Sequence, residues 1–150
     1  MSNEAIQTVV TSVTDLLKDS NQHDTVDSVI QRLLSFGYEV TDVDVWMIAF
    51  TMQKVTSQIL NEINHPFIPD GLKEVFVDKV CGEFLMMKRD TGTLILTNLD
   101  LDGVIQSIKE GDTSVTFSAE GSDEAKLNEL LSWLMHGKEG DLLCFRRMRW

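Results

Sequence analysis

Apolar side chains recur every three or four positions over residues 4–90, the pattern of helices that each bury one face. It predicts a first helix over residues 4–18 and a second from Val26 to Leu34. The polar stretch at residues 19–24 offers turn and cap residues between them, and Phe36-Gly37 ends the second helix.

The third predicted helix should be the longest. Thr41 and Asp42 can cap its start, and it should end before Pro66, because proline lacks the amide donor and the residue before it avoids helical geometry. Its buried stripe is expected to consist of Val45, Trp46, Ile48, Ala49, Met52, Val55, Ile59, Leu60 and Ile63.

A fourth helix is predicted to start at Pro69-Asp70 and to run to Thr91-Gly92. Its apolar face is broad and includes Phe84, so we expect this helix to be central. Glycine inside a helix costs roughly 1 kcal/mol relative to alanine. Gly82 therefore indicates a close approach of another helix at that position.

The periodicity changes after Gly92. Residues 94–101 fit a loop or irregular strand, while Ile105–Lys109 and Ser114–Phe117 are rich in β-formers and flank a turn-forming sequence at residues 110–113. A β-hairpin at about residues 104–118 is therefore predicted. Residues 121–124 can then cap a fifth helix, whose leucine stripe ends at Gly137.

The predicted fold is mainly α: a helical bundle of about five helices with one small β-hairpin and an extended C-terminal tail. A chain of 150 residues is near the commonest size of a single domain. We expect one helical domain over residues 1–141 and a short tail over residues 142–150.

Charge divides the chain into two parts. Residues 1–145 carry 10 basic and 24 acidic groups, a balance of −14, whereas the last five residues carry the three arginines Arg146, Arg147 and Arg149. A body with this negative balance is a poor candidate for binding nucleic acid, because non-specific binding depends on basic side chains that neutralise the phosphates. Simple solubility is the plainest explanation of the acidity.

Motifs for catalysis, cofactors or metals are not found. Neither a P-loop nor a dinucleotide-binding glycine pattern occurs, and Cys81 and Cys144 lack metal-ligand spacing with the histidines. We interpret the cysteines as reduced thiols that act as small hydrophobic residues. The Asp-Thr-Gly triplet at residues 90–92 also occurs in aspartic proteases, but here it follows a predicted helix and is best explained as a helix-ending turn. No enzyme activity, cofactor or metal is expected.

The first residues lack a basic segment followed by an apolar run, and no stretch approaches the roughly 20 apolar residues of a membrane span. We therefore expect neither export nor membrane anchoring.

Three segments together resemble a family. Gly82-Glu83-Phe84-Leu85 with Lys88 and a following Thr-Gly turn resembles the "GE(Y/F)L…K…TG" stretch of small phage head-tail connector proteins. Residues 105–117 are similar to their hairpin, and residues 145–150 are similar to their "(Y/F)RRLRW" tails. The resemblance covers roughly residues 67–150, and the preceding residues fit only in being helical.

The resemblance implies a ring, commonly of twelve copies, that docks under the portal protein and continues the DNA channel to the tail. Its partners would be other copies, the portal protein and a tail terminator or other neck protein, and double-stranded DNA would pass without specific binding. The implied location is the neck of a virion assembled in the host cytoplasm. A negative channel wall fits this role, because it would let DNA slide without sticking.

Two surfaces are expected to carry the contacts. The tail, with Phe145, Arg146, Arg147, Arg149 and Trp150, is the expected docking site for the portal, because aromatic residues and arginines are enriched in interface anchors. The hairpin is expected to pair with a neighbouring copy, because a lone two-stranded ribbon is marginal in water. Its interface residues would be Ile108, Val115 and Phe117.

Alternatives remain open at this point. The tail could be a frayed terminus. The chain could instead be a helical binding module, regulatory or chaperone-like, that holds one partner through its Arg/Trp tail. An enzyme is the third alternative.

Overall fold

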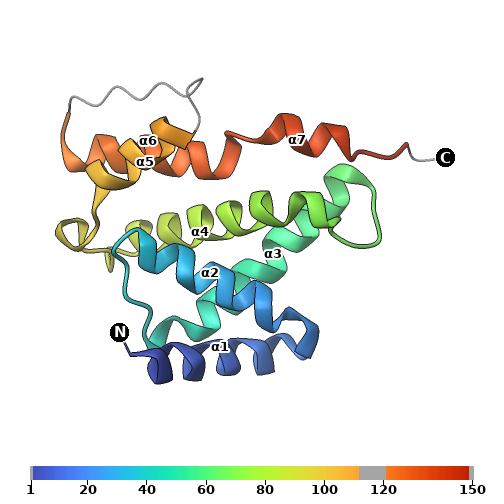
Figure 1. Cartoon of the computed structure of the whole chain (residues 1–150), viewed down its shortest axis with the longest axis horizontal. Coiled ribbons are helices and arrows are strands. Elements are labelled where there is room, and N and C mark those ends of the chain that lie inside the picture. Colours follow the sequence, from blue (N-terminus) through green and yellow to red (C-terminus); the bar gives the residue numbers. More distant parts are fainter. Residues whose placement is uncertain (1, 112–120, 149–150) are drawn as a thin grey trace.

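The computed structural model describes residues 2–111 and 121–148, and this part of the chain is mainly helical (Figure 1). Short 3-10 turns precede or link several of the α-helices. The α-helices are α1 (Asn3–Leu17), α2 (His23–Ser35), α3 (Val45–Ile63), α4 (Lys73–Asp90), α5 (Leu101–Gly111), α6 (Asp123–His136) and α7 (Glu139–Cys144).

Helix α4 is central, as predicted. It packs against α2 and α3 on one side and against α6 on the other, while α1 covers α2 and α3 (Figure 1). Phe84 is fully buried on α4, and its ring meets that of Tyr38 edge to face with centroids 5.3 Å apart. The bundle is therefore organised around one helix that is buried along most of its length.

Gly82 lies where α4 meets α6 most closely. A Cβ atom at this position would be 2.8 Å from Cγ of Met135 and 3.0 Å from Cβ of Leu134. Both distances are shorter than ordinary van der Waals contact, so only glycine lets the two helices approach this closely. The predicted close contact is confirmed.

Helix ends follow the predicted cap signals. The Ser122 hydroxyl accepts a hydrogen bond from the Ala125 amide at the start of α6. Thr41 and Asp44 form a capping box at the 3-10 turn before α3, which at 19 residues is the longest helix of the described chain. Asn64 ends α3 in a left-handed conformation, ahead of Pro66.

The predicted first strand is wrong. Ile105–Lys109 lies inside α5, which begins after Asp100, whose carboxylate accepts a hydrogen bond from the Gly103 amide. Leu101, Val104, Ile105 and Ile108 are spaced as a helical stripe and are all buried. Burial of this stripe outweighs the β-preference of the individual residues. The predicted second strand, with Val115 and Phe117, lies outside the described residues.

The two cysteines differ in their exposure to solvent. Cys81 is fully buried on α4, where burial raises the pKa of its thiol far above the usual value, so it acts as the small hydrophobic residue that was expected. Cys144 is also a free thiol, but it is exposed at the end of α7 and does not act as a buried hydrophobic residue.

Candidate functional site

The predicted tail begins later than expected and is attached to the bundle. Residues 142–144 belong to α7, and Leu142 is buried. Phe145 is half-buried against Gly71, where a Cβ atom would be 2.6 Å from Cζ of the phenylalanine ring. The glycine therefore makes room for the ring, and Phe145 anchors the start of the tail.

Two hydrogen bonds hold the next residues to the end of α3. The Arg147 amide donates to the Ile63 carbonyl at 2.7 Å, and the Asn64 side-chain amide donates to the Met148 carbonyl at 3.2 Å. The side chains of Arg146, Arg147 and Met148 remain exposed. The described tail is thus an ordered segment that displays basic side chains, while Arg149 and Trp150 lie outside the described residues.

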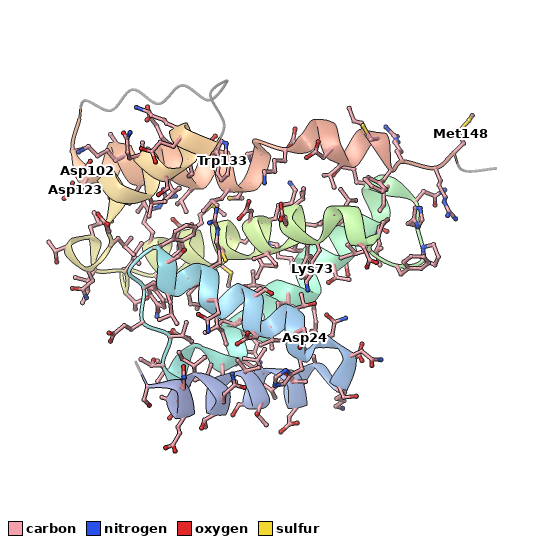
Figure 2. All side chains as sticks on the ribbon, viewed as in Figure 1. Asp24, Lys73, Asp102, Asp123, Trp133 and Met148 are labelled. Atoms are coloured by element: carbon pink, nitrogen blue, oxygen red, sulfur yellow. The ribbon has the colours of Figure 1, made fainter. Side chains whose placement is uncertain are left out.

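The tail lies at one end of the upper layer of helices. Figure 2 shows Met148 at the end of the upper layer opposite to Asp102, with Trp133 between them. The connection after α3 also carries Phe67, which is 62% exposed and meets the His65 ring edge to face at 5.5 Å. Basic and apolar groups are therefore both available at this end of the bundle.

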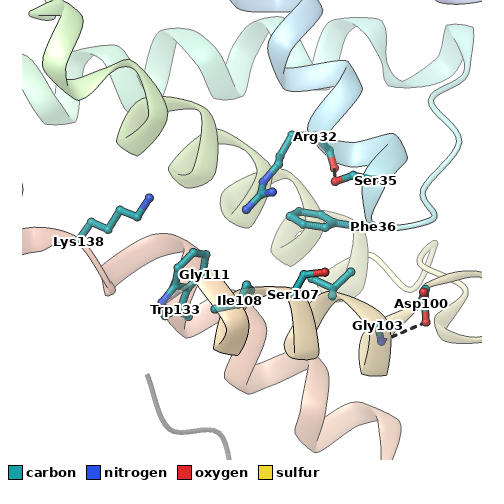
Figure 3. Close-up of a pocket in the computed structure, with 11 residues that line it drawn as sticks. Arg32, Ser35, Phe36, Asp100, Gly103, Ser107, Ile108, Gly111, Trp133 and Lys138 are labelled. Carbon is teal, nitrogen blue, oxygen red and sulfur yellow. Dashed lines mark hydrogen bonds between the residues drawn. The ribbon is translucent and has the colours of Figure 1, made fainter. Parts of the chain in front are cut away.

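An open cleft of about 680 Å³ lies between α2, α5 and α6 (Figure 3). Its walls carry two aromatic rings, Phe36 and Trp133, together with apolar groups of α5 that include Ile108. Ile108 was predicted on an inter-subunit hairpin, but it is a buried residue of α5 at the side of this cleft.

Two cations border the cleft and share one carboxylate. The buried Asp78 accepts from Nε of Arg32 at 3.1 Å and from Nζ of Lys138 at 3.4 Å. The Arg32 guanidinium lies 4.9 Å from the Phe36 ring centroid, and Lys138 Nζ lies 5.5 Å from that of Trp133. Each cation is therefore held by a carboxylate and by an aromatic face.

Trp46 was predicted to be part of the buried stripe of the third helix, but it is 64% exposed. It stacks on Phe50 with centroids 5.3 Å apart and an interplanar angle of 10°. Val43, one turn earlier, is 82% exposed. Val43 lies in the 3-10 turn before α3, and Trp46 and Phe50 lie on α3 itself. The three residues, which we call the α3 knob, are three or four positions apart and are all exposed. The three- and four-residue spacing of these apolar side chains can be seen in the sequence.

A buried ion pair fixes the chain beside the α3 knob. Asp44 accepts from Nζ of Lys88 at 3.0 Å, from the Tyr38 hydroxyl at 2.9 Å and from the Thr41 amide at 3.1 Å. Burial and the neighbouring carboxylate raise the pKa of the Tyr38 phenol well above its usual value, so it stays a hydrogen-bond donor.

Residues 2–111 and 121–148 contain no cluster of three or more His, Cys, Asp or Glu side chains that could hold a metal ion. The Asp-Thr-Gly triplet forms the end of α4, with Gly92 at a positive φ of 74°, as expected for a helix-ending turn. None of the helices described is long and apolar enough to cross a bilayer.

Comparison with known proteins gives no match: no family model matches the chain, and no curated protein or solved structure does.

Proposed function

We propose that this chain is a structural subunit of a phage head-tail connector ring, which docks under the portal protein and continues the DNA channel to the tail. The observation that carries the proposal is the exposed basic segment at Arg146 and Arg147, anchored at one end of a strongly acidic helical body. An acidic body suits a channel wall along which DNA slides, and an ordered basic segment suits attachment to another protein.

The sequence of the central helix, α4, gives further support to the connector proposal. The Gly82-Glu83-Phe84-Leu85 stretch, which resembles the connector family, lies at the buried centre of α4, where Gly82 allows α6 to pack. The resemblance at residues 105–111 does not support the proposal, because these residues are helical. The proposed location, the neck of a virion, and the ring of about twelve copies come with the resemblance.

A second candidate is a helical binding module that holds one partner through the same tail. The ordered Arg146–Met148 segment favours it equally, because its anchoring would serve any acidic partner. Sizing the purified chain with and without a portal protein separates the two. A connector should form a large closed ring in the presence of the partner, whereas a module should form a one-to-one complex.

Removal of Phe145 to Trp150 is expected to leave a cooperatively melting domain that no longer joins the portal. Loss of the half-buried Phe145 contact should lower the free energy of unfolding by only about 1–2 kcal/mol. Thermal melting and co-sedimentation with the portal measure the two effects. Loss of the cooperative melt would show that the tail is an essential part of the core.

A charge variant separates docking from stability. Arg146→Glu with Arg147→Glu should abolish co-sedimentation while keeping the melting temperature, because both side chains are exposed and the hydrogen bond of residue 147 is made by its backbone. Lys18→Glu, also at an exposed position, is the matched control and should still bind. Equal binding by the tail variant and this control would exclude the tail as the docking site.

A further inference from the structure

The α3 knob is an exposed aromatic surface on a rigid support. Trp46 and Phe50 stack on each other in the open, and Val43 extends the surface by one turn. Asp44, beside Val43, is tied to Tyr38 and Lys88 in the core. A preordered aromatic surface loses little conformational entropy on binding, which is a property of interface anchors.

The cleft between α2, α5 and α6 has complementary features. At about 680 Å³ it falls within the 300–1,000 Å³ range of typical binding sites. The rings of Phe36 and Trp133 and the side chain of Ile108 offer apolar contact to an inserted aromatic group. The cleft is thus a hollow lined by aromatic and apolar groups, and the α3 knob exposes side chains of the same kind.

The charged groups beside the α3 knob and around the cleft are unevenly placed, and this orients one surface relative to the other. From residue 33 to residue 53 the chain has three acidic side chains, Glu39, Asp42 and Asp44, and no basic one. Asp44 is paired with Lys88, whereas Asp42 is exposed next to Val43. At the cleft, Arg32 and Lys138 share the single carboxylate of Asp78.

The opposite end of the cleft carries Asp100, which is bonded to the Gly103 amide (Figure 3). An acidic group entering the cleft is therefore attracted to the Lys138 end and repelled from the Asp100 end.

We infer that the α3 knob of one copy binds in the cleft of a second copy, with Asp42 facing Lys138. Both surfaces lie on helices packed into one core, so the α3 knob cannot reach the cleft of its own chain. A contact between two different surfaces repeats from copy to copy and closes into a ring where the rotation allows it. The inference rests on the proposed function and specifies its subunit contact.

Cross-linking tests the pairing directly. In a Cys144→Ser background, Val43→Cys is made in one preparation and Ser107→Cys in another, and the two are mixed and oxidised. Ser107 lines the cleft and Val43 is exposed on the α3 knob, while the natural Cys81 is buried. A disulfide-linked dimer is expected only in the mixture. A yield no higher than with Ile95→Cys, an exposed site outside the α3 knob, overturns the pairing.

Variants of the full chain give a second test by sedimentation. Trp46→Ala is expected to weaken self-association by about 30-fold, the usual size of a hot-spot effect. Asp42→Lys and Lys138→Glu should each weaken it, and the two changes together should restore it. Ile95→Ala is the control, and thermal melting checks that each variant is folded. Failure of the combined variant to restore association rejects the Asp42–Lys138 contact.

The outcomes separate this inference from the proposed function. If the wild type forms rings with the portal and the α3 knob variants do so equally well, the pairing is wrong and the connector proposal stands. If the cross-link forms but no ring appears with the portal, the pairing stands and the connector proposal is wrong.

Discussion

Replacing Phe84 with alanine is expected to lower the free energy of unfolding by about 3–5 kcal/mol. The side chain is fully buried on α4 and meets Tyr38 edge to face. Its removal loses the transfer free energy of an aromatic ring and leaves a cavity at the centre of the bundle, where α4 is packed on opposite sides and cannot easily collapse inward. Chemical denaturation followed by far-ultraviolet circular dichroism measures the change.

Phe67→Ala is the matched control. The same truncation at a side chain that is 62% exposed should change stability by no more than about 0.5 kcal/mol. A loss below about 1 kcal/mol for Phe84→Ala would contradict the central position of α4.

The sequence predicted most of the helical framework because its helices carry two independent signals. Apolar periodicity identified α1, α2, α3, α4 and α6, and cap or stop residues placed their ends close to where they lie. Ser122 at the start of α6 and Asn64 at the end of α3 show why: each satisfies or redirects the backbone at a helix end. The central position of α4 followed from the width of its apolar face.

Helix α5 was missed because two signals conflicted. Ile105 and Ile108 are β-branched, and residues 110–113 have turn chemistry, which together favoured a hairpin. Counting from Asp100, however, Leu101, Val104, Ile105 and Ile108 follow the helical three-and-four spacing. Their burial against the rest of the bundle, including α6, is a tertiary effect, which a local propensity does not include. Helix α7 has only six residues, too few for periodicity to identify.

The candidate surfaces were predicted less well than the fold. The basic tail was visible as a change in charge, but its hydrogen bonds to Ile63 and Asn64 join residues far apart in the sequence. Trp46 was assigned to the buried stripe of the third helix, although its position two residues before Ile48 places it on nearly the opposite side of the helix from that buried residue. The cleft could not be predicted at all, since it depends on the position of the unpredicted α5.

Replacing Lys88 with methionine is expected to lower the free energy of unfolding by about 3–5 kcal/mol, because it removes one partner of a buried ion pair. Asp44 is 1% exposed and would keep its bonds to Tyr38 and Thr41 but lose the only cation within salt-bridge distance among the described residues. Methionine keeps the length and most of the packing of the lysine stem, so the loss measures the uncompensated charge. Denaturant unfolding of purified protein provides the number.

The double variant Lys88→Met with Asp44→Asn decides whether charge is the cause. Asparagine removes the buried negative charge and can still accept from Tyr38 and Thr41, so the double variant should be more stable than Lys88→Met alone. If the two are equally unstable, lost packing around Lys88 explains the effect.

Asp44 also fixes the chain next to Val43. Lys88→Met should therefore lower the yield of the cross-link between Val43→Cys and Ser107→Cys, even under conditions where the variant is fully folded. The double variant should recover part of that yield.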